Sequence, residues 1–198
     1  MTLQFRPAFC IFALPRSRTA WLAHWLRRDG LLVGHDIAIE CDEPGQFIAS
    51  YHNGMAGTVE TGAIEAWRLL HAALPGLRLV TIRRPLAEVE ASLAAFGLEA
   101  HDELLLRDAM LDEIEALGLA ERLDYEALES IPARKWLWDY CRGDHFDPQW
   151  DASFAVTNIQ VNMAARITQL LRRGPAMNSL RAQVSALSSE LSLCPTLN

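Results

Sequence analysis

The sequence predicts an α/β fold in which a central parallel sheet is covered by helices. Short apolar runs at 9–14 and 77–85, the second rich in β-branched residues, are typical of buried parallel strands. Each run is followed, after a short connection, by a segment whose apolar residues have helical spacing. From about residue 100 to 173 the pattern is mostly helical. We therefore expect four or five parallel strands and a helical C-terminal half.

Length and composition indicate one folded domain. The chain has 198 residues, of which 51% are hydrophobic and 22% charged, as in ordinary globular proteins. Gly174 and Pro175 interrupt the helical pattern, so we place the domain at 1–173 and a C-terminal tail at 174–198. Leu180, Val184, Leu187 and Leu191 have the spacing of a short amphipathic helix in that tail.

The charge balance and the cysteines exclude several classes of partner. The formal net charge of −7 repels polyanions, so neither nucleic acid nor an anionic membrane is an expected partner. The four cysteines lack the spacing of metal ligands or of a disulfide framework, so we expect no metal site and reduced thiols. The sequence shows neither a signal-peptide pattern nor a stretch of membrane-spanning length, which predicts a cytoplasmic protein.

The elements follow one another in a regular order. After the strand at 9–14, Trp21, Leu22, Trp25 and Leu26 lie on one face of a helix that Gly30 can end. The next apolar stretch is a second strand or a loop and carries His35 and Asp36. Four further elements are expected: a strand that ends near Glu60, a helix from Ala63 to Leu74, a helix opened by Pro85, and a last short strand within 122–128.

The loop between the first strand and the first helix has the composition of an anion site. Arg16, Ser17 and Thr19 supply a permanent cation and two hydroxyls beside a helix N-terminus. The loop lacks the glycine pair and the lysine of a Walker A motif, which binds a nucleoside triphosphate together with magnesium. The anion bound here therefore need not bring a metal. We expect Arg16 to be exposed. Ser17 or Thr19 could also cap the helix.

Residues 15–22, Pro-Arg-Ser-Arg-Thr-Ala-Trp-Leu, resemble the phosphosulfate-binding loop of sulfotransferases that use 3′-phosphoadenosine 5′-phosphosulfate. The resemblance implies a three-layer P-loop-type fold, similar to bacterial and phage-type members, in which residues 16–20 bind this cofactor: Arg16, Ser17, Arg18, Thr19 and Ala20. Arg18 replaces the usual glycine, and Ala20 replaces a second threonine. A non-glycine residue at 18 predicts that the loop does not require a positive φ there.

The segment from Arg83 to Ser92 is similar to the part of these enzymes that grips the 3′-phosphate. The match assigns Arg84 and Ser92 to that phosphate, and Arg83 is the fallback assignment. Strand alternation points Arg83 and Arg84 in opposite directions, so only one of them is expected to reach the nucleotide. Arg84 could instead pair with Glu88 one helical turn away.

The catalytic residues implied by the resemblance are Arg16 and Glu60, the latter as the general base in a Val-Glu-Thr-Gly segment. His35 beside Asp36 is the alternative base, because a carboxylate can orient an imidazole for proton abstraction. The implied reaction transfers a sulfuryl group to a hydroxyl or amine of a small-molecule acceptor and leaves adenosine 3′,5′-bisphosphate.

Two alternatives stay open at the level of sequence. The first is a P-loop phosphoryl transferase, such as a nucleotide or small-molecule kinase. The second is a noncatalytic nucleotide-binding protein whose loop has degenerated. A homo-oligomer formed through the C-terminal half is also compatible with the sequence.

Overall fold

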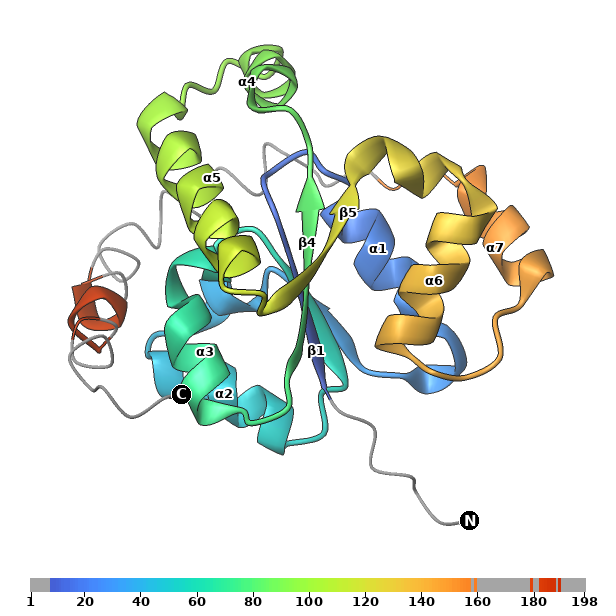
Figure 1. Ribbon diagram of the computed structural model, residues 1–198, viewed down its shortest axis with the longest axis horizontal. Helices are drawn as coiled ribbons and strands as arrows, with labels where there is room; N and C mark the ends of the chain where they lie inside the picture. Colours follow the sequence, from blue (N-terminus) through green and yellow to red (C-terminus); the bar gives the residue numbers. More distant parts are fainter. Residues whose placement is uncertain (1–7, 158, 160–178, 180–181, 188, 190–198) are drawn as a thin grey trace.

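The computed structural model describes residues 8–157, 159, 179, 182–187 and 189, and it has the predicted α/β architecture (Figure 1). All five strands are parallel and hydrogen-bond in the order β2-β3-β1-β4-β5. The strands are β1 (Phe9–Ala13), β2 (Val33–His35), β3 (Gly57–Glu60), β4 (Arg78–Arg83) and β5 (Ala120–Asp124). The prediction of a parallel sheet is therefore confirmed. The last short strand is present but lies earlier than the predicted 122–128, and residues 125–129 form a 3₁₀ turn instead.

Helices cover both faces of the sheet, which makes three layers. In Figure 1, α1, α6 and α7 lie on one side, α2, α3 and α5 lie on the other, and α4 follows the end of β4. The helices are α1 (Thr19–Leu26), α2 (Pro44–His52), α3 (Trp67–Ala73), α4 (Leu86–Ala94), α5 (His101–Ala116), α6 (Ile131–Cys141) and α7 (Pro148–Ala155). Four 3₁₀ turns connect them: η1 (Arg28–Gly30), η2 (Ile37–Glu40), η3 (Ala63–Ala66) and η4 (Tyr125–Glu129).

Strand β1 occupies the centre because its side chains are apolar on both faces. Phe9, Ile11 and Ala13 join the core beneath α1 and α6, whereas Cys10 and Phe12 join the core beneath α2 and α3. The register also explains a glycine in the neighbouring strand. A Cβ at Gly57 would lie 2.3 Å from the Phe9 ring, so only glycine fits there.

Helix α1 differs from the expected amphipathic helix. Its residues are buried except His24, because the sheet covers one side and α6 and α7 cover the other. Trp25, for example, stacks edge-on against Trp138 of α6 at 5.1 Å between ring centroids. The C-terminus of α1 is held by the buried Arg142, whose Nη1 donates to the carbonyls of Leu26 at 2.6 Å and Arg28 at 2.8 Å.

Two further expectations require adjustment. Pro85, which the sequence predicts as the first helical residue, is instead the N-cap residue of α4, one position before its first helical residue, Leu86. In the tail, residues 182–187 are helical, whereas Gly174, Pro175, Leu180, Leu191 and the boundary at residue 173 lie outside the described residues. Within the described part of the chain, no helix combines the length and apolar character needed to span a membrane.

Candidate functional site

The loop that joins β1 to α1 lies where ligands of open α/β sheets gather. Because β1 and β4 are parallel neighbours in the sheet, the segments that follow them start at the same edge of the sheet (Figure 1). The loop after β1 contains Arg16, Ser17 and Arg18, and Arg84 follows β4. These residues therefore come together at one edge of the sheet.

The backbone of this loop contradicts the expectation at residue 18. Arg18 has φ +59° and Arg16 has φ +67°, both in the left-handed region. For a residue with a Cβ this conformation costs about 1–2 kcal/mol, so contacts elsewhere must hold it. The carbonyl of Arg16 accepts a hydrogen bond from Arg84 Nη1 at 2.6 Å, and the Arg18 guanidinium pairs with Glu129. These long-range contacts hold a backbone conformation that a glycine would adopt without this cost.

Arg16 is half-buried, and not exposed as the sequence suggested. Its Nε donates to Ser92 Oγ at 3.1 Å, and its guanidinium lies 4.6 Å from the centroid of the Phe96 ring. Ser92 and Phe96 belong to α4 and the residues just after it. The loop arginine and the predicted phosphate-binding serine, 76 residues apart in sequence, are therefore in direct contact.

The two arginines at the end of β4 point in opposite directions, as strand alternation requires. Arg83 faces α5 and forms ion pairs with Asp108 at 3.0 Å and Asp112 at 2.7 Å. Arg84 instead reaches the loop and also pairs with Glu88 at 3.2 Å. The ion pair with Glu88, which the sequence offered as the alternative to phosphate binding, is therefore present, and Arg84 contacts the loop as well.

The η4 turn contributes residues that sequence reasoning missed. The guanidinium of Arg84 lies 4.6 Å, and that of Arg18 5.6 Å, from the centroid of the Tyr125 ring. Glu129, at the end of the same turn, holds Arg18. Tyr125 directly follows β5, where ligands of parallel sheets gather, but the sequence placed it in the middle of the expected strand at 122–128.

The hydroxyls of the loop do not cap helix α1. Arg18 occupies the N-cap position, and no side chain accepts a capping hydrogen bond there. Ser17 Oγ is fully buried and has no hydrogen-bond partner among the residues that the structure describes, which is rare for a hydroxyl and costs stability. Ala20, which stands where the resemblance implies a second threonine, is buried in the first turn of α1. Ser17 therefore has unused hydrogen-bonding capacity within the loop.

His35 joins the loop through Thr19. Its Nε2 lies 3.1 Å from Thr19 Oγ1 and 3.5 Å from Asp36 Oδ2. Asp36 Oδ1 accepts from the backbone nitrogen of Thr61 at 2.7 Å and from its hydroxyl at 2.9 Å. The carboxylate is thereby fixed, so it can orient the imidazole and stabilise its positive charge.

Glu60 is not in an exposed loop but fully buried at the end of β3. Its carboxylate accepts hydrogen bonds from the backbone nitrogens of Ile37 at 3.0 Å and Ala38 at 3.4 Å. Because His35 pairs with Val59 in the sheet register, Glu60 points to the opposite face from His35. The structure thus gives Glu60 the role of fixing the η2 turn, and places His35 beside the loop.

Among the described residues, no group of three or more histidine, cysteine, aspartate or glutamate side chains is arranged to hold a metal ion. The side chains gathered around the loop are arginines, hydroxyls, the His35 imidazole, and carboxylates that pair with them. Comparison of the sequence with models of known protein families and with curated proteins gives no match.

Proposed function

We propose that the chain is a cytoplasmic sulfotransferase that moves a sulfuryl group from 3′-phosphoadenosine 5′-phosphosulfate to a hydroxyl or amine of a small acceptor. The observation that carries this proposal is the cluster of Arg16, Arg84 and Ser92 at the carboxyl ends of β1 and β4. A donor with phosphate groups at both its 5′ and 3′ positions needs cations from more than one segment. The loop after β1 and the start of α4 supply them.

The residues present fit such a donor. Arg16, Arg18 and Thr19 would hold the 5′-phosphosulfate together with the buried Ser17 hydroxyl, which lacks a partner within the described chain. Arg84 and Ser92 would hold the 3′-phosphate, since a guanidinium can take two phosphate oxygens at once. When bound, the donor supplies the sulfuryl group, whose bond to the 5′-phosphate breaks as the acceptor attacks.

Three groups of this chain would act on the reaction. His35 Nε2 accepts the acceptor's proton, and Asp36 Oδ2 at 3.5 Å stabilises the resulting imidazolium. Arg16 lies in a half-buried position, where its charge stabilises negative charge on the leaving phosphate more strongly than it would in water.

The test of this proposal is the nucleotide preference of wild-type protein and of two arginine variants. Wild type should bind adenosine 3′,5′-bisphosphate more tightly than AMP or magnesium ATP. Arg84→Ala should weaken bisphosphate binding by about 1.5–3 kcal/mol, because a charge-assisted contact is lost, and should remove most of the preference over AMP. Isothermal titration calorimetry measures all three ligands.

Arg83→Ala is the matched control. It removes the same charge from the neighbouring residue, but its ion pairs face α5. This variant should lose stability and keep the preference for the bisphosphate. Tighter binding of magnesium ATP than of bisphosphate by wild type would favour the phosphoryl-transfer alternative. Bisphosphate binding without transfer to any acceptor would favour the noncatalytic one.

Glu129→Gln is expected to bind the bisphosphate about twofold to fivefold more tightly than wild type at low salt, because Arg18 no longer has an exposed carboxylate partner. Glu126→Gln changes the net charge equally within η4 and should have a smaller effect. The difference should shrink as salt is added, since the pair is exposed. Equal affinities for the two variants would contradict a role of Arg18 in anion binding.

A further inference from the structure

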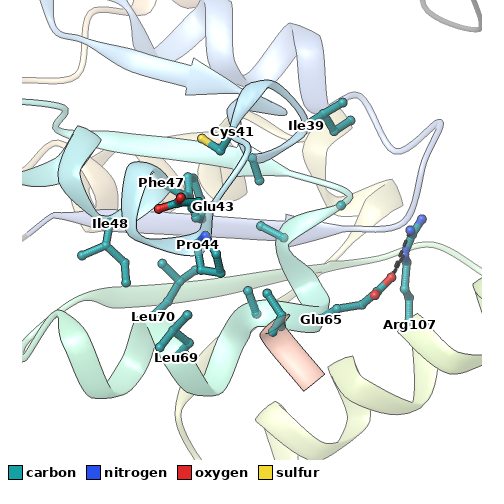
Figure 2. A pocket seen from close by; sticks show the side chains of 15 residues that line it. Ile39, Cys41, Glu43, Pro44, Phe47, Ile48, Glu65, Leu69, Leu70 and Arg107 are labelled. Carbon is teal, nitrogen blue, oxygen red and sulfur yellow. Dashed lines mark hydrogen bonds and ion pairs between the residues drawn. The ribbon is translucent and has the colours of Figure 1, made fainter. Parts of the chain in front are cut away.

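An apolar groove lies on the face of the sheet that carries α2 and α3, away from α1. Figure 2 shows its walls, formed by η2 and the start of α2 on one side and by η3 and α3 on the other. The groove is open to solvent on one side, and about 570 Å³ of space, the solvent at its mouth included, lies between its lining residues. The lining is mainly aliphatic and aromatic, with Ile39, Phe47, Leu69 and Leu70 among its residues.

The polar side chains at one end of the groove already have partners. Arg107 Nη2 pairs with Glu65 at 3.2 Å and lies 3.7 Å from Glu103. A charged ligand would have to compete with these pairs, and an uncharged one would not. Small residues, Gly62, Ala63 and Ala66, line the wall formed by η3 and leave the space open. The groove therefore suits an uncharged apolar body.

A residue of the C-terminal tail completes this lining. Val184 borders the groove and is only 6% exposed, whereas the described residues around it, 182–183 and 185–187, are exposed. In Figure 2 the faint red ribbon of this segment lies beside the residues of α3. The segment 182–187 thus directs one apolar side chain to the groove and keeps its other residues in solvent.

We propose that this groove binds an uncharged, apolar small molecule, and that Val184 forms the wall that closes over it. The ligand is held by burial of its apolar surface between α2, α3 and the tail. Arg16, Arg84 and Ser92 do not line the groove. The proposal is therefore independent of the anion that the loop binds.

The test titrates the full chain with N-phenyl-1-naphthylamine, a neutral probe whose fluorescence rises in apolar surroundings. Wild type should bind it at one site. Val184→Asp should weaken binding roughly tenfold, because the wall loses the contact of a buried valine. Ala186→Asp adds the same charge at an exposed position of the same segment and should leave the affinity unchanged.

Two variants that fill the groove test whether the probe binds there. Ala66→Trp and Ile48→Trp each place a large ring in the lining and should abolish binding. Ala152→Trp, an exposed substitution on α7, should not affect it. Thermal melts identify any variant that fails to fold. Affinity of Val184→Asp equal to that of wild type, or unchanged binding in both groove-filling variants, would overturn the proposal.

Cys41 gives an independent local readout. It is half-buried and lines the groove, whereas burial raises the pKa of the Cys10 and Cys141 thiols and keeps them unreactive. In a Cys194→Ser background, the probe should slow labelling of Cys41 by a maleimide, and Val184→Asp should accelerate it. Bisphosphate affinity, measured on the same variants, should stay at the wild-type value. A rate of Cys41 labelling that changes neither with the probe nor with Val184→Asp would contradict the proposed site.

Discussion

Replacing Asp151 with alanine is expected to lower the free energy of unfolding by about 3–5 kcal/mol, because it leaves the buried Arg134 charge without a partner. Both oxygens of Asp151 accept from Arg134, at 2.7 Å from Nε and 2.8 Å from Nη2. Arg134 Nη1 also donates to the carbonyl of Leu128 at 2.8 Å. These contacts attach α7 and η4 to α6. Urea unfolding, followed by circular dichroism, measures the loss.

Two controls separate charge burial from other effects of the substitution. Asp139→Ala breaks the exposed pair of Asp139 with Lys135 on α6 and should cost only about 0.3–0.5 kcal/mol. The double variant Arg134→Leu with Asp151→Leu removes both charges and should be more stable than Asp151→Ala alone. A loss below about 1 kcal/mol in Asp151→Ala would show that Arg134 finds solvent or another partner.

The sheet could be predicted because its signals are local. Short apolar runs and the turns that bound them identify β1 and β4, and the alternation of extended backbone at the end of β4 separates Arg83 from the next residue, Arg84. Both inferences use residues that are adjacent in sequence. They depend on backbone geometry that every strand shares, so no distant contact was needed.

The loop conformation could not be predicted in the same way. Arg18 adopts a positive φ in contact with Glu129, which lies 111 residues further along the chain. No local pattern indicates such a partner. The partial burial of Arg16 likewise depends on Ser92 and Phe96, whose positions follow from the packing of α4.

The choice between Glu60 and His35 needed the register between strands. Alternation within each strand is visible in the sequence, but the pairing of His35 with Val59 is not. A shift of one residue would exchange the faces of the two side chains. For this reason the sequence left both candidates open, and the structure distinguishes their surroundings.

His35→Ala is expected to slow sulfuryl transfer by roughly two to four orders of magnitude while bisphosphate affinity stays close to that of wild type. The physical reason is that Nε2, beside Thr19 Oγ1 and Asp36 Oδ2, is the proton acceptor proposed here. Single-turnover transfer from the donor, with the best acceptor from a panel of phenols, alcohols and amines, gives the rate. Added imidazole should restore part of the activity, which a purely structural defect would not allow.

Glu60→Gln is the matched comparison and should behave in the opposite way. In the amide, an NH2 group replaces one of the two carboxylate oxygens and faces a backbone N–H that it cannot accept from, so the buried defect should cost about 1–3 kcal/mol of stability. Below its melting temperature this variant should transfer at nearly the wild-type rate. Full activity in His35→Ala, combined with a large rate loss in a folded Glu60→Gln, would assign the general base to Glu60 and a structural role to His35. Because Glu60 is fully buried and accepts from the backbone of η2, that outcome would require the turn to move before an acceptor could reach the carboxylate.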